Sequence, residues 1–259
     1  MLCSKIIDVL NKIAPESFAL EWDNVGLLVG DKNNEINKII IGLDLTNEII
    51  NQAIKSNVNM IITHHPIFFK GIKKITDSPE SKRVIRLIKH NICHYAAHTN
   101  LDICQTGTNF ALFNLLELEN MQGLEDLKYG FMGRVGQLKN KMMLENFANF
   151  IKNKLGLEKI NFYGDKNAMI KKVALCTGSA SNYVYFLLAK KNNCDVYLTG
   201  DIKYHDALLA LDLNLNLIDV THHASEKIFA PVLKNEINKY LPNMQIICEK
   251  YNDDLFHVL

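Results

Sequence analysis

The sequence predicts an α/β fold built from two similar, intertwined α/β lobes. Apolar runs of strand length alternate with amphipathic helical stretches, and the order strand–helix–strand–helix–strand occurs twice along the chain. In both halves the third strand ends at a histidine, His98 in the first and His222 in the second. These observations favour an internal duplication whose strand ends meet in one cleft, where open α/β sheets bind ligands. One continuous doubly wound sheet is the alternative interpretation.

We expect the first lobe to span residues 1–126 and to contain four helices and four strands. Apolar residues three and four apart predict helices over residues 4–13, 47–56, 81–89 and 106–116. Apolar runs predict strands over residues 27–30, 38–43, 58–63 and 92–97. Trp22, the only tryptophan, lies in a polar turn, and it either plugs the core or forms a pocket wall or subunit contact.

We expect the second lobe to span residues 127–259, with a C-terminal segment that is free to pack back on the first lobe. Clustered glycines over residues 117–140 predict a crossing between the lobes. Helical periodicity then predicts helices over residues 144–155, 183–191 and 205–211. Apolar runs predict strands over residues 160–164, 172–176, 195–199 and 215–220.

The composition is that of a globular protein without a marked charge bias. The chain has 259 residues, is 48% hydrophobic and 22% charged, and has a formal net charge of +1. Nucleic acid is therefore not favoured as a partner, and the basic run at residues 70–74 is interpreted as a solvated loop. No apolar run has the length of a membrane span, and no signal peptide is expected. Six scattered cysteines indicate reduced thiols in a cytoplasmic protein.

Histidines and carboxylates follow the predicted strands. His64 and His65 are adjacent at a strand end, where Pro66 prevents continuation of the strand and allows both rings to face one point. His98 precedes Asp102 by four residues, and His222 precedes Glu226 by four, so each pair shares one face if the segment is helical. Imidazole and carboxylate together suit borderline divalent metals such as Zn²⁺, Fe²⁺ or Mn²⁺.

The predicted ligand set is larger than one tetrahedral ion needs. It comprises His64, His65, Asp102, His222 and Glu226. We therefore expect two divalent ions per subunit, with Asp102 as the bridging carboxylate. His98 is either a further ligand or an outer group, and His98 and His205 are the candidates for proton transfer. His90, His94 and His257 are expected not to be ligands, and His223 is expected to face away from the ions.

Five motifs are spread over the whole chain. They are Trp22-Asp23-Asn24-Val25-Gly26, Thr63-His64-His65-Pro66, His98-Thr99-Asn100-Leu101-Asp102, Thr199-Gly200-Asp201-Ile202-Lys203-Tyr204-His205 and His222-His223-Ala224-Ser225-Glu226. Together they resemble the Nif-three-like family, whose bacterial members are commonly labelled GTP cyclohydrolase 1 type 2 homologues. The resemblance implies a two-lobed α/β fold, a ring-shaped homohexamer and a dinuclear metal site facing an internal cavity. By position, the family's ligands fall on the same five residues.

Two functions follow as hypotheses. The first is a dinuclear metal-dependent hydrolase that acts on a nucleotide or related small molecule through metal-bound hydroxide. Opening of the imidazole ring of GTP is the reaction that the resemblance implies, and hydrolysis of a phosphoester or nucleotide is a related alternative. The second is a non-catalytic hexameric scaffold that binds metal or a partner protein. Loss of turnover on Asp102→Ala with the fold retained would favour the enzyme.

Overall fold

The structure is a computed structural model, and it describes residues 1–249. The protein is a mixed α/β chain with two sheets. It divides into unit 1, which comprises Met1–Leu101 and the C-terminal segment from Phe229, and unit 2, which comprises Asp102–Ile228. The division differs from the expected boundary after residue 126, which falls inside strand β5 (Glu119–Leu127) of unit 2.

Unit 1 is built on a five-stranded sheet in the order β1-β4-β3-β2-β11. Its strands are β1 (Gly26–Val29), β2 (Lys38–Gly42), β3 (Met60–Thr63), β4 (Cys93–Ala96) and β11 (Gln245–Cys248). Strands β2, β3 and β4 are parallel, and β1 pairs antiparallel with β4. Strand β11, which the sequence patterns did not predict, pairs parallel with β2. The C-terminal segment therefore belongs to unit 1.

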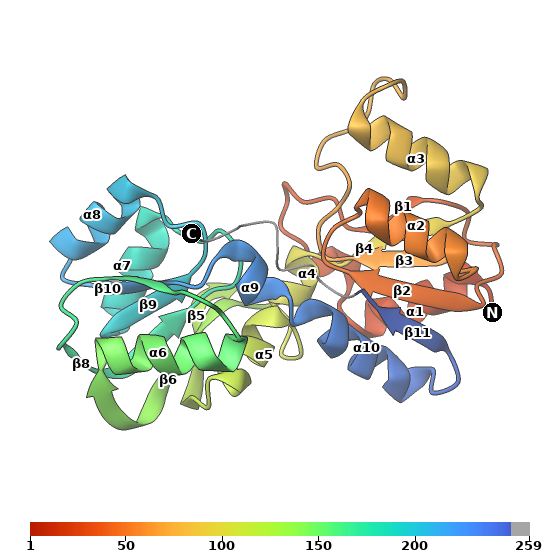
Figure 1. The fold of residues 1–259 in the computed structure, drawn as a ribbon. Helices are drawn as coiled ribbons and strands as arrows, with labels where there is room; N and C mark the ends of the chain where they lie inside the picture. Colours follow the sequence, from red (N-terminus) through yellow and green to blue (C-terminus); the bar gives the residue numbers. More distant parts are fainter. Residues whose placement is uncertain (250–259) are drawn as a thin grey trace. The chain divides into compact units, whose positions relative to one another are not determined.

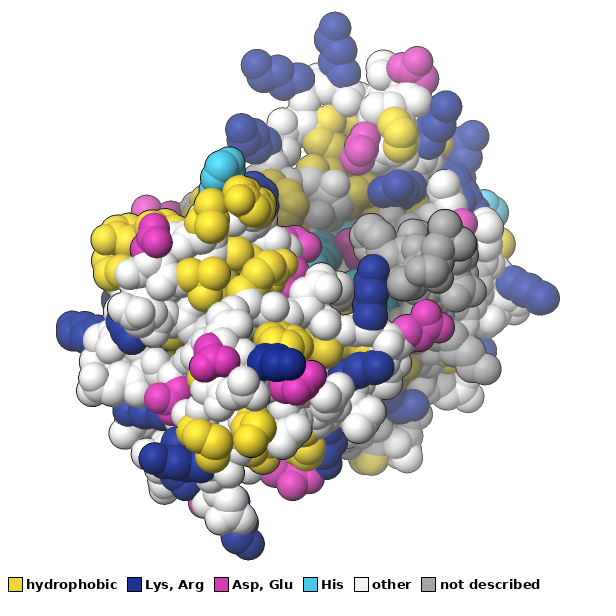
Figure 2. Space-filling model, turned by 60° about the vertical axis from the view of Figure 1, so that its left-hand side comes forward, with side chains coloured by type: hydrophobic (Ala, Val, Ile, Leu, Met, Phe, Trp, Pro, Cys, Tyr) yellow, Lys and Arg dark blue, Asp and Glu magenta, His cyan; other side chains and the backbone are white. Residues whose placement is uncertain are grey.

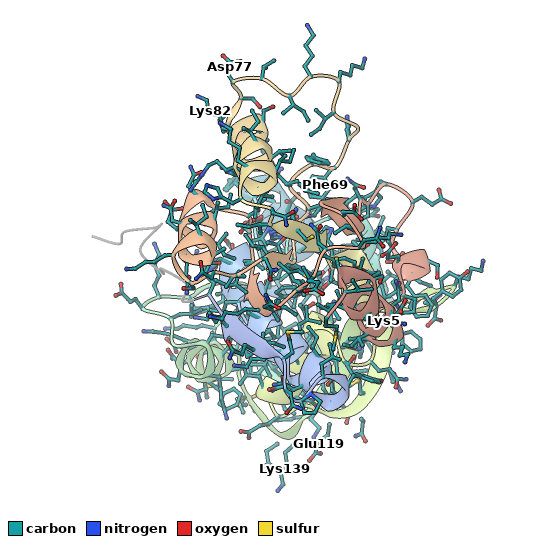
Figure 3. All side chains as sticks on the ribbon, turned by 90° about the vertical axis from the view of Figure 1, so that its right-hand side faces the viewer. Lys5, Phe69, Asp77, Lys82, Glu119 and Lys139 are labelled. Atoms are coloured by element: carbon teal, nitrogen blue, oxygen red, sulfur yellow. The ribbon has the colours of Figure 1, made fainter. Side chains whose placement is uncertain are left out.

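Helices cover both faces of this sheet (Figure 1). They are α1 (Cys3–Ile13), the 3₁₀ turn η1 (Glu16–Phe18), α2 (Asn47–Lys55), α3 (Pro79–Lys89) and α10 (Phe229–Tyr240). Helices α2 and α3 lie together, as do α1 and α10. Thr46 and Ser78 cap α2 and α3 by accepting backbone N–H groups, which satisfies donors that the first helical turn leaves unpaired. Between β3 and α3, a long loop extends from Phe69 past Asp77 (Figure 3).

Unit 2 is built on a six-stranded sheet in the order β5-β6-β8-β9-β10-β7. Besides β5, its strands are β6 (Gly130–Met143), β7 (Asn161–Tyr163), β8 (Met169–Leu175), β9 (Val196–Thr199) and β10 (Asn216–Asp219). The expected crossing over residues 117–140 was wrong, because β5 and β6 form a long antiparallel hairpin there. The glycines in that stretch fit close contacts within the sheet. At Gly133, for example, a Cβ would lie 2.7 Å from the carbonyl oxygen of Leu175 on the neighbouring strand β8.

The helices of unit 2 are α5 (Thr108–Leu115), α6 (Leu144–Leu155), α7 (Tyr183–Lys191), α8 (Tyr204–Asp212) and α9 (His222–Glu226). Residues of α5 and α6 pack with β8, β9 and β10 into one apolar core, and α7 contacts α8. Exposed hydrophobic side chains remain on both of these last helices: Tyr183, Val184, Leu187, Tyr204, Leu208 and Leu211. Figure 2 shows hydrophobic side chains interspersed with charges of both signs. None of the helices within residues 1–249 is long and apolar enough to cross a bilayer.

The two units share an element order. Unit 1 reads α1-β1-β2-α2-β3-α3-β4, and unit 2 reads α6-β7-β8-α7-β9-α8-β10. In each unit the last three strands are parallel neighbours, and the first strand pairs antiparallel with the last. A short helix, α4 (Thr99–Asp102), follows β4 and carries the chain from unit 1 into unit 2.

Candidate metal centre

Three histidines of unit 1 form a compact cluster. His64 and His65 directly follow β3, and His98 follows β4, which is the parallel neighbour of β3. Because parallel neighbours end at the same edge of a sheet, the three rings converge there. Their centroids are 5.1 Å apart for His64 and His65, 5.0 Å for His64 and His98, and 5.4 Å for His65 and His98. One nitrogen of each ring lies within 4.8 Å of those of the other two.

An oxygen lies against the Nδ1 atom of every ring in this cluster. His64 Nδ1 is 2.8 Å from the carbonyl oxygen of Ala97. His65 Nδ1 is 2.9 Å from a carboxylate oxygen of Asp44, and His98 Nδ1 is 3.0 Å from one of Asp23. A protonated Nδ1 that donates to such an oxygen leaves Nε2 as the nitrogen that can ligate a metal, and metal-binding histidines are held in this way.

Asp23 has a buried side chain whose role the sequence patterns did not predict. Its carboxylate accepts hydrogen bonds from His98 and from both the backbone N–H, at 3.1 Å, and the hydroxyl of Thr99. Burial acts to raise the pKa of Asp23, but hydrogen bonds and charge from His98, and hydrogen bonds from Thr99 and Asn24, outweigh it, so the pKa is lowered. Asp23 therefore stays ionised and holds His98 in place.

Trp22 does not plug the core, which was one of the two interpretations of its turn. Its side chain is 58% exposed. The indole lies edge-on to the His98 ring at 5.8 Å, and at 6.1 Å from the ring of Phe69. The turn at residues 21–25 therefore carries one aromatic and one acidic neighbour of the histidine cluster.

Unit 2 supplies a histidine and carboxylates. His222 and Glu226 lie on α9, and His222 Nε2 is 3.0 Å from Glu226 Oε2. These two atoms are close enough to share one ion at ordinary metal–ligand distances of about 2.0–2.2 Å. His222 Nδ1 lies 2.8 Å from a carboxylate oxygen of Asp201, which repeats the arrangement of unit 1. Thr221 caps α9 by accepting the N–H of Ala224 at 3.3 Å.

A glycine turn encloses the carboxylate of Glu226. A Cβ on Gly178 would lie 2.4 Å from Glu226 Oε1, and Gly178 has φ +74°, a conformation that other residues rarely adopt. The Gly178 N–H donates to the hydroxyl of Ser225 at 2.9 Å, and that hydroxyl donates to the carbonyl of His222 at 2.7 Å. The turn after β8 is thus tied to the helix that carries both donor groups.

Asp102 is buried at the start of unit 2, with an exposed fraction of 6%. Thr108 donates its hydroxyl to the Asp102 carboxylate, and the same hydroxyl lies 3.0 Å from that of Thr177. Asn109 donates to the Asp102 carbonyl at 3.2 Å and accepts the Thr177 N–H at 2.9 Å. Within unit 2, the residues that hold Asp102 are therefore continuous with the Gly178 turn that encloses Glu226.

A buried arginine holds the chain directly after Asp102. Arg134, on β6, is 2% exposed and donates to the carbonyl of Cys104 at 2.8 Å and to that of Ile103 at 3.5 Å. It also donates to the carbonyls of Phe131 and Gly133 at 2.6 and 2.8 Å. Burial lowers the pKa of the guanidinium, and the negative charge of Asp102 opposes that shift.

The other histidines within residues 1–249 are His90, His94, His205 and His223. His94 is fully buried on β4 and is 2.8 Å from the hydroxyl of Thr63, and burial lowers its pKa to about 3. His205 is exposed at the start of α8, with its ring edge-on to Tyr204 at 5.3 Å. His90 follows the last residue of α3. His223 lies on α9, and His257 lies outside the described residues.

Comparison with known proteins assigns a family to this chain. The family described as Duf34/NIF3 (NGG1p interacting factor 3) matches residues 1–254. The chain belongs to the Duf34/NIF3 family. A GTP cyclohydrolase 1 type 2 homolog of Clostridium acetobutylicum is 33% identical over 258 residues, which is 96% of each chain. One from Campylobacter jejuni is 35% identical over 256 residues, or 97% of this chain and 98% of the relative.

A solved structure of the family has the same fold. The crystal structure of Staphylococcus aureus protein SA1388 aligns over 100% of this chain and 99% of that one, with a TM-score of 0.92 and 30% identity. The resemblance to this family that the five motifs indicated is therefore confirmed. As a member of the Duf34/NIF3 family, the chain has the family's two-sheet α/β fold, and it has His/Glu donor groups suited to a metal ion.

Proposed function

We propose that the protein is a metal-dependent hydrolase that acts on a nucleotide or related small molecule. In this proposal His64, His65, Asp102, His222 and Glu226 bind two divalent ions, Zn²⁺, Fe²⁺ or Mn²⁺. The supporting observation is that the Nδ1 atoms of all four histidines at the strand ends, including His98, lie against a carbonyl or carboxylate oxygen. Metal-ligating histidines almost always donate their other ring N–H to such an oxygen.

Two of the proposed carboxylate ligands lie near the points where the chain passes between the units. Asp102 is the first residue of unit 2 and belongs to the same helix, α4, as Thr99 of unit 1. Glu226 lies two residues before Ile228, where the chain leaves unit 2 again.

The ions would supply Lewis acidity at the electrophilic atom of the substrate. The side chains have separate tasks. Asp44 and Asp201 orient His65 and His222, Asp23 orients His98, and Asp102 is the candidate bridge between the ions. His98 and His205 are proposed to move protons to and from the substrate.

The substrate class and the assembly are part of the same proposal. The relatives' name, GTP cyclohydrolase 1 type 2 homolog, supports a nucleotide-related substrate. Exposed apolar residues on α7 and α8 support a homo-oligomer, which we propose to be a hexamer. The shared element order supports a duplication, and six free cysteines support a cytoplasmic location.

Metal analysis of protein purified without chelator, followed by a nucleotide and phosphoester screen with Mn²⁺, Fe²⁺ or Zn²⁺, tests the proposal. We expect metal-dependent turnover that Glu226→Gln abolishes while the fold, followed by circular dichroism, is kept. Glu145→Gln on the exposed surface of α6 is the matched control and should retain full turnover. Bound metal without turnover on any substrate would instead favour the metal-binding scaffold.

A further inference from the structure

Two exposed aromatic side chains lie beside the histidine cluster of unit 1. Trp22 is 58% exposed and Phe69 is 47% exposed. Both rings meet the His98 ring edge-on or nearly so, each with a centroid distance of 5.8 Å. They are 6.1 Å from one another and inclined by 45°. Large aromatic surface left in water lowers stability compared with burial, so its placement here calls for a reason.

The segments that carry these rings are fixed to the rest of unit 1 by hydrogen bonds. Asp23, the neighbour of Trp22, is bonded to His98 and to Thr99. Asn24 donates its side-chain amide to the carbonyl of Phe68, the neighbour of Phe69, at 2.8 Å. The two aromatic residues are therefore held in position relative to His98 before any ligand arrives, which lowers the entropy cost of binding.

Charge next to Phe69 is positive. Lys70, Lys73 and Lys74 follow it in the same exposed loop, whereas the exposed Glu21 precedes Trp22. An anionic group on a ligand would therefore be favoured on the Phe69 side and disfavoured on the side of Glu21.

We propose that Trp22 and Phe69 form the stacking site for a planar heteroaromatic ring that carries an anionic substituent, such as the base of a nucleotide with its phosphate toward Lys70. This inference rests on the proposed function and specifies how the substrate is oriented against the histidine cluster. Every nucleobase has a π-face that can stack on an aromatic side chain. An aliphatic substrate would gain nothing specific from two rings in this arrangement.

The chain offers a direct measurement, because Trp22 is its only tryptophan. Its intrinsic fluorescence reports on this position alone. We expect GMP to quench the fluorescence saturably in the metal-loaded protein, and ribose 5-phosphate, which has the anion but no ring, to leave it unchanged. A response to ribose 5-phosphate equal to that of GMP would overturn the ring assignment.

Substitutions separate the contributions of the two aromatic residues. Phe69→Ala keeps the fluorophore, and we expect it to raise the Kd of GMP about 5- to 150-fold, the range that loss of one base–aromatic contact produces. Trp22→Ala, followed by equilibrium dialysis, should raise the Kd similarly, and Trp22→Phe should restore most of the affinity. Tyr240→Ala, which removes a comparably exposed ring on α10, is the control and should bind GMP normally.

Subunit number and metal content show which proposal is wrong if the binding experiments give another result. If Trp22→Ala changes the subunit number in sedimentation while GMP affinity is unchanged, the tryptophan is a subunit contact and the stacking proposal is wrong. Metal content is expected to be unchanged in Trp22→Ala and Phe69→Ala. If both variants bind metal, turn over substrate and bind GMP with unaltered affinity, the stacking proposal is wrong and the proposed function stands. If the unmodified protein binds no metal, the proposed function itself is wrong.

Discussion

The two units place different chemistry at corresponding strand ends. After β3 of unit 1 come His64 and His65, whereas after the corresponding β9 of unit 2 come Gly200 and Asp201. Unit 1 thus contributes a cluster of imidazoles, and unit 2 contributes one imidazole with the carboxylates of Glu226 and Asp102. The comparison shows that one element order can present imidazoles alone in one unit, and carboxylates with an imidazole in the other. Charge compensation of bound cations should therefore depend on unit 2.

The largest expected effect tests that dependence. Glu226→Gln keeps the size of the side chain and removes its charge, and we expect metal affinity to fall by more than the roughly 10- to 100-fold that outer partners of ligands contribute. His65→Gln in unit 1 should lose affinity without changing the charge balance, and so by less. Calorimetric titration with Mn²⁺ measures both. An equal or larger loss of metal affinity in His65→Gln would contradict the dependence of charge compensation on unit 2.

Arg134 allows a stability comparison between the units. We expect Arg134→Met to lower the free energy of unfolding by about 2–4 kcal/mol, because buried carbonyls after Asp102 lose their donor. Arg86→Met in unit 1 removes bonds to Asn47 and Asn51 at the surface, and should cost within about 0.5 kcal/mol. Urea denaturation measures both variants. Similar losses would mean that the carbonyls find other donors.

Outer carboxylates give a matched pair with a smaller effect. Asp44→Asn in unit 1 and Asp201→Asn in unit 2 each weaken the acceptor for a histidine Nδ1. Each should lower metal affinity by roughly 10- to 100-fold and leave the unfolding free energy nearly unchanged. If only one of the two substitutions lowers metal affinity, metal binding depends chiefly on the unit that contains the substituted residue.

The smallest expected effect is a pH dependence of the metal-free protein that resides in unit 1. Burial raises the pKa of Glu249 from 4.5 to about 7, helped by Asp44 and Glu48, so its stabilising contribution is present below pH 4.5 and is lost as pH rises to about 7. The pKa of His94 is lowered from 6.5 to about 3 by burial, so its contribution is present above pH 6.5 and is lost as pH falls toward 3.

Because the two contributions oppose one another, each is visible only when the other is removed. Glu249→Gln should make stability rise more steeply with pH between about 4.5 and 6.5, and His94→Gln should make it fall across the same range. Urea denaturation at several pH values, with chelator present, measures both slopes. Unchanged slopes in both variants would show that neither group titrates differently on folding.

Sequence patterns predicted most elements because the strands are continuous apolar runs and the helices have clear periodicity. The predicted helices over residues 144–155 and 183–191 agree with α6 and α7 at both ends. The hairpin of β5 and β6 was missed because glycines, which usually mark loops, here permit close packing inside the sheet. Strand β11 (Gln245–Cys248) was also missed, although strands of equal length such as β9 were predicted.

The candidate ligands could be found from sequence because they follow strands directly, but their supporting residues could not. Asp23 lies 75 residues from His98 along the chain, and only the pairing of β1 with β4 brings their segments together. Asp44 could have been found more easily. It follows β2, and His65 follows β3, the parallel neighbour of β2. A search for acids at the ends of strands adjacent to a histidine-bearing strand would have found it.

The chain leaves unit 1 at Leu101 and returns to it at Phe229, so unit 2 is one continuous piece and unit 1 is not. During synthesis all of unit 2 is translated before β11, the strand that borders β2. The imidazole-bearing sheet of unit 1 therefore keeps an unpaired edge at β2 until the last part of the chain has been made. A chain that ended after residue 228 would lack β11 altogether and would leave this edge open to chaperones.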